Sequence, residues 1–150
     1  MVAKTYATLV GTTKKLFVCD RIKLMADAPK KIMVIEDDRF LSTLAKARLE
    51  KEGFAVAQAF DGEEALNFLR NDAPPDLMIM DLIMPKVTGF ELLQAISITP
   101  GLANIPVIIL SNLAQESDIE KAKQLGAKEY FIKVKVSIDD LVNKIKQLLS

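Results

Sequence analysis

Two kinds of hydrophobic pattern alternate along the chain from Lys30 onward. One is a short run of consecutive apolar residues, found at residues 32–35, 55–57, 77–80, 107–110 and 130–132. A run that is apolar at every position is typical of a strand buried on both faces, as in a parallel sheet. We therefore predict five strands at these positions.

The other pattern is amphipathic, with apolar residues recurring every three or four positions, and it predicts helices. It occurs at residues 39–52, 62–71, 88–98, 115–125 and 137–149. The last segment has the most regular pattern, and Ser137 and Asp140 form a capping-box start for it. Gly53 and Gly126 each follow a predicted helix and precede a strand, where a left-handed C-cap is needed.

Five strand–helix units in about 120 residues are too few for a closed eight-fold barrel, and they favour an open, doubly wound α/β fold around a parallel sheet. In such a fold right-handed crossovers place helices on both faces of the sheet, and ligands bind in a crevice at the carboxyl ends of the strands. The residues that directly follow each apolar run are therefore the candidates for a functional site.

The composition narrows the chemistry that such a site can carry out. The 150 residues include no histidine, which excludes a Ser-His-Asp triad, a Cys-His dyad, zinc held by histidine and a phosphohistidine on this chain. Carboxylates remain for metal or acid chemistry, and they suit hard cations such as Mg²⁺. The single cysteine, Cys19, cannot form an internal disulfide, so we expect a reducing, cytoplasmic location.

Charge is unevenly distributed, although 20 basic and 20 acidic side chains balance over the whole chain. Residues 1–29 have a net charge of +3 and residues 30–150 have a net charge of −3. A mildly acidic body argues against nucleic acid as a partner. The longest uncharged stretch of the first segment, residues 5–13, is too short and too polar for a signal peptide or a membrane span. We therefore expect no membrane partner.

We interpret residues 1–29 as a flexible N-terminal extension and residues 30–150 as one folded domain. Residues 1–24 are expected to be dispensable, because Met25 is a natural start for the domain that follows. A chain that begins at Met25 should therefore still unfold cooperatively.

Polar residues that can act together stand at the ends of four predicted strands. Glu36, Asp37 and Asp38 follow the first strand, Asp81 follows the third, Ser111 and Asn112 follow the fourth, and Tyr130 and Lys133 lie within or after the fifth. Loops begin with polar residues in any case, but carboxylates that converge on one crevice repel each other unless a cation compensates. Glu36, Asp37 and Asp81 would therefore form a site for Mg²⁺, which also accepts phosphate oxygens. Asp38 is interpreted as a helix cap.

These residues resemble the receiver domains of bacterial two-component response regulators, in particular single-domain regulators of the chemotaxis type. Residues 31–38 are similar to the family's first strand and acidic pair, and residues 80–85 with Gly89 are similar to its phosphoacceptor segment. Ser111 and Lys133 match the family's hydroxyl and lysine positions in order and spacing. The resemblance covers residues 30–150 and implies a flavodoxin-like (βα)5 fold with the strand order 2-1-3-4-5.

The resemblance also implies a role for each candidate residue. Asp81 would be the phosphoacceptor, attacking a phosphohistidine on a sensor histidine kinase or a histidine phosphotransfer protein. Mg²⁺ would be held by Glu36, Asp37, Asp81 and the backbone carbonyl of Ile83. Lys133 would neutralise charge on the phosphoryl oxygens.

Two further residues would convert phosphorylation into a signal. Ser111 would donate a hydrogen bond to a phosphoryl oxygen and move toward it, and Tyr130 would be the aromatic switch that turns inward as the hydroxyl moves. The change would shift the equilibrium between two states of the surface made by residues 115–125, 130–132 and 137–149. Through this face the protein would bind an unknown downstream protein or form a dimer.

The chain departs from the family pattern at three positions. Val134 replaces a proline that usually follows the lysine in cis linkage. A cis bond without proline costs about 2.5 to 4 kcal/mol, so we predict a trans Lys133–Val134 bond and a rearranged loop that leaves the aim of Lys133 open, with Lys135 as the alternative cation. Asn112 stands where Ala or Gly is common, and would narrow the site or add a hydrogen bond. Ile83 is apolar at a position that influences access of the hydrolytic water, so we expect a slowly hydrolysing phosphoaspartate.

Three function classes remain open. The favoured one is a phosphoacceptor switch that assists its own phosphorylation and dephosphorylation without being an enzyme; because the last predicted helix ends at the chain terminus, we expect no output domain. The alternative is a degenerate receiver that acts as a phosphate-independent interaction module, which Val134 and Asn112 support. The third is an aspartate-nucleophile phosphatase, which usually has a second Asp where this chain has Ile83.

Overall fold

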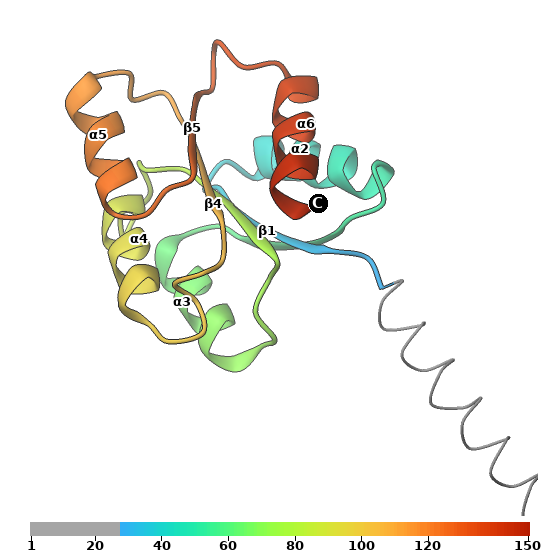
Figure 1. Ribbon diagram of the computed structural model, residues 1–150, viewed down its shortest axis with the longest axis horizontal. Coiled ribbons are helices and arrows are strands. Elements are labelled where there is room, and N and C mark those ends of the chain that lie inside the picture. Colours follow the sequence, from blue (N-terminus) through green and yellow to red (C-terminus); the bar gives the residue numbers. More distant parts are fainter. Residues whose placement is uncertain (1–27) are drawn as a thin grey trace, which may run out of the picture.

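The computed structural model describes residues 28–150, which form a five-stranded sheet and five helices (Figure 1). The strands are β1 (Lys31–Ile35), β2 (Ala55–Ala59), β3 (Leu77–Met80), β4 (Val107–Ser111) and β5 (Glu129–Ile132). The helices are α2 (Arg39–Lys51), α3 (Gly62–Asn71), α4 (Gly89–Ile98), α5 (Glu116–Gln124) and α6 (Ile138–Leu149). Each predicted element is present, and the predictions for Cys19 and for a start at Met25 lie outside the described residues.

The sheet has the predicted topology. All neighbouring strands pair in parallel, and they lie in the order β2-β1-β3-β4-β5. In this register Ile35, the last residue of β1, lies beside Ala59 of β2 and Met80 of β3. The connections leave β1 and β3 toward opposite sides of the sheet, so a crevice opens between the carboxyl ends of these two strands.

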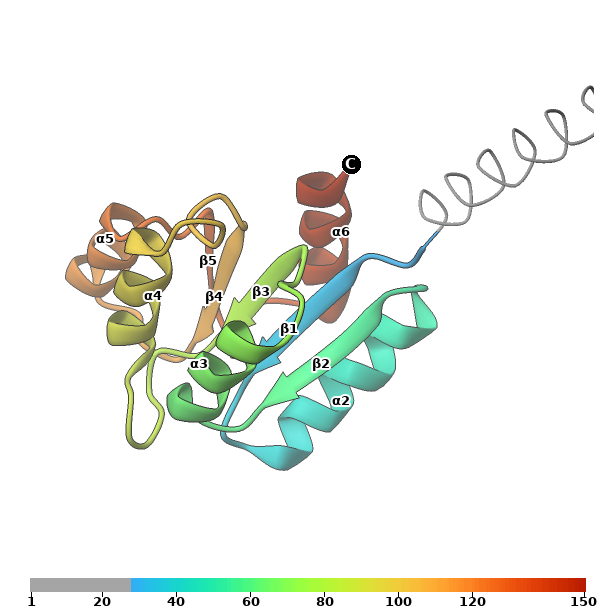
Figure 2. The same cartoon turned by 90° about the horizontal axis from the view of Figure 1, so that it is seen from below.

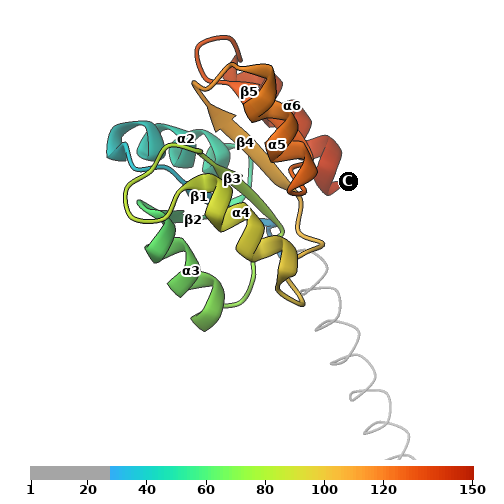
Figure 3. The same ribbon diagram turned by 90° about the vertical axis from the view of Figure 1, so that its left-hand side faces the viewer.

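Helices cover both faces of the sheet, as the views in Figure 2 and Figure 3 show. On one face α2 and α6 pack against side chains such as Ile32 and Val34 of β1. On the other face α3, α4 and α5 pack against the alternate positions, such as Met33 and Ile35. Side chains of consecutive strand residues point to opposite faces, so the uninterrupted apolar runs supply two separate cores.

The second strand is two residues longer than its apolar run predicts. Gln58 and Ala59 continue the pairing with β1, although Gln58 is polar. The Gln58 side-chain amide donates a hydrogen bond of 2.8 Å to the Oγ of Ser42, which is fully buried on α2. A satisfied hydrogen bond removes the main cost of placing a polar residue in the sheet. A hydropathy pattern cannot show that this partner exists.

Polar side chains fix where the helices begin. Asp38 caps α2, as predicted, with one carboxylate oxygen accepting from the backbone N–H groups of Phe40 and Leu41. Ser137 caps α6 by accepting from the Asp140 N–H at 3.1 Å. The Asp140 side chain accepts from the Ser137 hydroxyl, so only half of the predicted capping box forms. None of the described helices has the length and apolar character needed to cross a membrane.

We expect the substitution Ile108→Ala to lower the free energy of unfolding by about 2 to 5 kcal/mol, because it leaves a cavity in a closely packed core. Ile108 is fully buried in β4 between α6 and its neighbouring strands. The matched control is Ile98→Ala at the exposed end of α4, where the residue is 76 % accessible. That change should stay within about 0.5 kcal/mol of the parent protein. Urea unfolding followed by circular dichroism measures both, and equal effects would contradict the assignment of the core.

Candidate functional site

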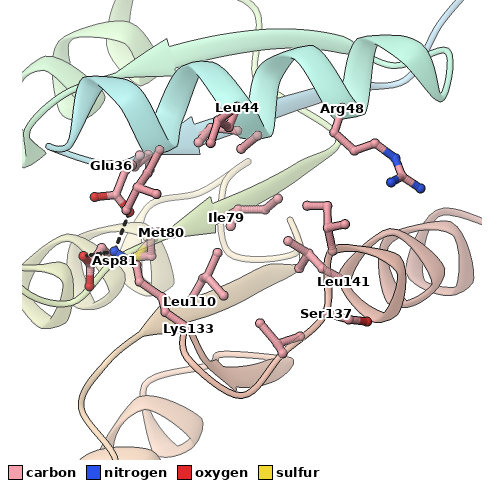
Figure 4. A pocket seen from close by; sticks show the side chains of 16 residues that line it. Glu36, Leu44, Arg48, Ile79, Met80, Asp81, Leu110, Lys133, Ser137 and Leu141 are labelled. Atoms are coloured by element: carbon pink, nitrogen blue, oxygen red, sulfur yellow. Dashed lines mark hydrogen bonds and ion pairs between the residues drawn. The ribbon is translucent and has the colours of Figure 1, made fainter.

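Three charged side chains from different strands meet at the carboxyl edge of the sheet (Figure 4). Glu36 directly follows β1, Asp81 follows β3, and Lys133 follows β5. Backbone hydrogen bonds extend the sheet pairing to each of them. The N–H of Glu36 donates to the Ala59 carbonyl, that of Asp81 to the Ile35 carbonyl, and that of Lys133 to the Ser111 carbonyl, each at 3.0 Å. The sheet itself therefore fixes the point from which each side chain starts.

The Lys133 ammonium joins the two buried carboxylates. Its Nζ lies 2.6 Å from Glu36 Oε2 and 2.7 Å from Asp81 Oδ2. The side chains of both acids are only 9 % accessible, and that of Lys133 is 16 % accessible. Water therefore screens the repulsion between the carboxylates poorly, and the ammonium is the group that balances it.

Burial and ion pairing have opposite effects on the pKa values of Glu36 and Lys133. Burial raises the pKa of Glu36 above its ordinary value, and the hydrogen bonds from Lys133 and from the Asp38 N–H offset this only in part. Burial lowers the pKa of Lys133, but its hydrogen bonds to Asp81 and Glu36 outweigh burial, so the pKa is raised overall. At neutral pH Lys133 therefore carries a positive charge within the acidic cluster.

The peptide bond after Lys133 is trans, as predicted, since no peptide bond among residues 28–150 is cis. The loop closes on itself, with the N–H groups of Lys135 and Val136 donating to the Ile132 carbonyl. Val134 points outward and is 81 % accessible. Although the sequence left the aim of Lys133 open, its ammonium reaches the cluster, and the alternative cation Lys135 is exposed to solvent.

The predicted metal ligands lie together. Glu36, Asp37 and Asp81 each offer a carboxylate oxygen, and these oxygens lie within 4.8 Å of one another. Asp37 is exposed to solvent, whereas the other two are buried. Asp81 Oδ1 accepts from the backbone N–H groups of Leu82 at 2.7 Å and Ile83 at 3.3 Å. Hard oxygen donors with one solvent-facing side are a fitting set for a hydrated Mg²⁺ ion.

Ser111 and Tyr130 both bond to the main chain of Leu113. The buried Ser111 Oγ accepts from the Leu113 N–H at 3.3 Å, and the Tyr130 hydroxyl donates to the Leu113 carbonyl at 2.7 Å. Burial raises the pKa of the Tyr130 phenol, which therefore stays protonated at neutral pH. Asn112, between Ser111 and Leu113, is exposed.

A feature that the sequence did not predict is a cavity of about 500 Å³ between α2 and α6. One end is formed by Glu36, Asp81 and Lys133, and Figure 4 shows the cavity running from there between the two helices. Apart from Arg48 and Ser137, its walls are apolar, and they include Leu44 of α2, which is 53 % accessible, and Leu141 of α6. Leu44 and its neighbours follow an ordinary helical period, so their pattern does not distinguish an open groove from a closed core.

The raised pKa of Glu36 gives a pH dependence of stability whose sign can be predicted. The folded protein holds this proton more tightly than the unfolded chain does, so the free energy of unfolding falls as the pH rises from 4.5 through the higher folded pKa. We expect Glu36→Gln to remove that contribution, so its stability relative to the parent should increase with pH over this window. Urea unfolding at several pH values in the presence of EDTA measures the difference. Glu50→Gln on the exposed side of α2 is the control, and equal slopes for the two variants would contradict the prediction.

Comparison with known proteins agrees with this geometry. Residues 32–146 match the family described as response regulator receiver domain. The chain is 40 % identical over 119 residues to the transcriptional regulatory protein CpxR of Escherichia coli, covering 79 % of this chain and 49 % of that protein. It is 34 % identical to the gliding motility regulatory protein of Myxococcus xanthus, covering 79 % of this chain and 15 % of that protein. The chain thus spans half or less of the length of these two relatives.

The fold comparison leads to the same family. The receiver domain of the Francisella response regulator 1452 superposes with a TM-score of 0.73 at 31 % identity, covering 80 % of this chain and 96 % of that domain. The carboxylate cluster, the lysine, the buried hydroxyl and the strand order thus occur in a chain whose sequence matches one family over most of its described length. This chain belongs to the response regulator receiver domains.

Proposed function

We propose that this chain is a phosphoacceptor switch of a two-component system, with Asp81 as the residue that is phosphorylated. The observation that carries the proposal is the convergence of Asp81 with Lys133 and two further carboxylates at one edge of the sheet. Family membership supports the same function. The degenerate-receiver alternative gains no support, because Val134 leaves the Lys133 ammonium at 2.7 Å from Asp81.

The reaction is the transfer of a phosphoryl group from a histidine of another protein. A carboxylate oxygen of Asp81 forms a bond to phosphorus while the phosphorus–nitrogen bond breaks, and the electron pair of that bond stays on the imidazole. Such a transfer needs positioning and charge neutralisation rather than covalent help. The backbone N–H groups of Leu82 and Ile83 hold Oδ1 of Asp81, so its carboxylate is already oriented. The Lys133 ammonium stands ready to neutralise an incoming phosphoryl oxygen.

Glu36, Asp37, Asp81 and the backbone carbonyl of Ile83 would hold Mg²⁺ in this site. The three carboxylates fit the ion because their oxygens lie close together and one side faces solvent. When bound, the ion supplies charge neutralisation for the phosphoryl oxygens. Lys133 also offsets the charge of the Glu36 and Asp81 carboxylates, through contacts of 2.6 and 2.7 Å.

Phosphorylation would act on the rest of the domain through Ser111 and Tyr130. The Ser111 hydroxyl now accepts a hydrogen bond from the Leu113 N–H. To donate a hydrogen bond to a phosphoryl oxygen it must reorient, which would disturb its contact with Leu113. Tyr130 holds the carbonyl of the same residue, so a shift at Leu113 reaches both side chains. Because Leu113 precedes α5 and Tyr130 lies in β5, the change would bias the face made by α5, β5 and α6. We propose that face for a downstream protein or a dimer.

The surroundings of Asp81 suit a protein donor. Six large apolar side chains on this side of the domain are at least 41 % accessible, namely those of Phe40, Leu41, Leu44, Ile83, Val134 and Ile138. Exposed apolar groups around a polar site are typical of an interaction surface. We propose that a sensor histidine kinase or a histidine phosphotransfer protein docks here and presents its phosphohistidine to Asp81. The single cysteine supports a cytoplasmic location, and the net charge of −3 over residues 30–150 argues against nucleic acid as the direct partner.

We expect the protein to gain one phosphoryl group when incubated with Mg²⁺ and acetyl phosphate, because the site provides a positioned carboxylate and neutralising cations. Intact mass spectrometry measures the gain. Asp81→Asn should abolish it, whereas Asp76→Asn, at the opposite end of β3, should leave it unchanged. No gain in the parent protein would favour a phosphate-independent module, and sustained release of phosphate from many esters would favour a phosphatase.

We also propose that the phosphoaspartate hydrolyses slowly, because Ile83, which stands two residues after Asp81 and is 60 % accessible, has no polar side-chain group that could position the attacking water. After removal of acetyl phosphate the phosphorylated mass should persist for minutes or longer. Ile83→Ser should shorten its lifetime by supplying a hydroxyl that can position water, whereas Ile98→Ser, at the exposed end of α4, should not. Loss of the phosphoryl group from the parent protein within seconds would contradict the proposal.

A further inference from the structure

The loop that leaves Asp81 packs tightly on the first turn of α3. This loop, residues 82–88, connects β3 to α4 and carries the backbone carbonyl of Ile83. Gly62, the buried first residue of α3, lies directly against Val87 of the loop. A Cβ on Gly62 would stand 2.5 Å from the Val87 carbonyl oxygen and 2.6 Å from the Val87 Cβ. Gly62 is therefore required by close approach of two backbones.

Lys86 gives the loop a strained turn. Its φ is 67°, the only positive value of a residue other than glycine among residues 28–150. The Val87 N–H donates to the Pro85 carbonyl at 2.9 Å, which closes a three-residue turn around Lys86. A γ-turn with positive φ at its central residue is rare and strained, and a strained segment persists only where its surroundings hold it.

The Lys86 side chain supplies part of that restraint. Its ammonium lies 3.3 Å from Asp61 Oδ2 and 3.4 Å from Glu63 Oε2, and both acids belong to the start of α3. Asp61 is also the N-cap of α3, with its Oδ1 accepting from the Glu64 N–H at 2.7 Å. One carboxylate thus fixes the helix end with one oxygen and the loop with the other.

The far end of the loop is held equally closely. Gly89 opens α4, and its N–H donates to the Leu82 carbonyl at 3.0 Å. A Cβ on Gly89 would overlap the carbonyl oxygen of Asp81. The backbone from Asp81 to Gly89 is therefore confined between α4 on one side and the start of α3 on the other.

We propose that Asp61, Gly62 and Lys86 are positioning residues for phosphoryl transfer. By docking the loop on α3 they hold the Ile83 backbone in place relative to the Asp81 carboxylate, so the start of α3 sets the geometry of the phosphorylation site. The inference rests on the proposed function, because it assigns these residues to the reaction at Asp81. It also makes a claim about cation binding that can be measured without phosphoryl transfer.

A stabilising role and a positioning role have different consequences. Lys86 is 58 % accessible, and exposed ion pairs contribute little to global stability. Loss of the pairs should therefore leave the free energy of unfolding close to that of the parent. A small displacement of a reacting group, by contrast, can slow a reaction by about a hundredfold.

The first test compares three variants of Lys86. Lys86→Met removes the charge and with it the ion pairs, Lys86→Gly also relieves the strain of the positive φ, and Lys86→Arg keeps both the charge and the pairs. We expect the Met and Gly variants to accept phosphate from acetyl phosphate several-fold more slowly and to bind Mg²⁺ more weakly by isothermal titration calorimetry. The free energy of unfolding in urea should stay near the parent value for the Met variant and at or above it for the Gly variant, whose backbone strain is relieved. Lys86→Arg should restore both rate and Mg²⁺ binding. Lys144→Met, which breaks a similar pair with Glu129 at the opposite end of β5, is the control and should change neither.

The second test enlarges Gly62. Gly62→Ala should displace Val87 and slow phosphorylation by about tenfold or more, with a matching loss of Mg²⁺ affinity. Its control is Gly53→Ala, where φ is +93° but no atom lies within 4 Å of an added Cβ. That variant carries backbone strain without touching the loop, so it should lose stability and keep its phosphorylation rate. If Gly62→Ala does not fold, the Lys86 variants decide the question.

The outcomes separate the two proposals. If the parent protein gains no phosphoryl group, the proposed function fails, and Mg²⁺ affinity still reports whether the loop is held by α3. If the parent is phosphorylated but the Gly62 and Lys86 variants match it in both rate and Mg²⁺ affinity, the positioning role is wrong. Loss of stability in proportion to loss of rate across all variants, the Gly53 control included, would likewise overturn it.

Discussion

Two carboxylates, Glu36 and Asp81, begin from backbone positions that the parallel sheet fixes through hydrogen bonds to the strands beside them. Neither backbone can move away from the other without breaking sheet pairing, and both residues are largely shielded from water. Their repulsion must therefore be balanced by a positive charge brought from elsewhere in the chain. Lys133 provides it from the end of β5, two strands away from Asp81. The site is consequently a product of the strand order as much as of the residues themselves.

The surroundings of this charged centre differ on its two sides. Toward α2 and α6 the domain is open, with an apolar cavity of about 500 Å³ that reaches Asp81. Toward α3 and α4 it is closed, because Gly62 and Gly89 allow the loop after Asp81 to lie against the helix ends. The side of Asp81 that is open to a partner is thus different from the side that holds its main chain in place. A partner can approach from the open side, while the closed side keeps the main chain next to Asp81 in place.

The hydrophobic pattern of the sequence was sufficient to predict the elements and the identity of the charged cluster, whereas the strand order followed from the family resemblance. The elements and the cluster depend on hydrophobic period and on the position of polar residues after buried runs, both of which are local in the sequence. The sequence did not predict where the Lys133 side chain points, because this depends on how the loop at Val134 folds back on Ile132. The sequence also did not predict the contact between Gly62 and Val87, because two backbones that are 25 residues apart approach each other closely there.

A change at the Asp81 carboxylate would reach the distant face made by α5, β5 and α6 through the end of β4. Lys133 and Ser111 share a backbone hydrogen bond, and Ser111 and Tyr130 share Leu113, so the end of β4 is the junction of the charged site and the aromatic side chain. Phosphorylation would add negative charge where one ammonium already serves two carboxylates. To donate to a new acceptor, the Ser111 hydroxyl would have to move or rotate, and this movement would change the hydrogen bond that it accepts from the Leu113 N–H. Because packed side chains have discrete arrangements rather than continuous ones, the result would be a shift between two states of the segment that leads into α5.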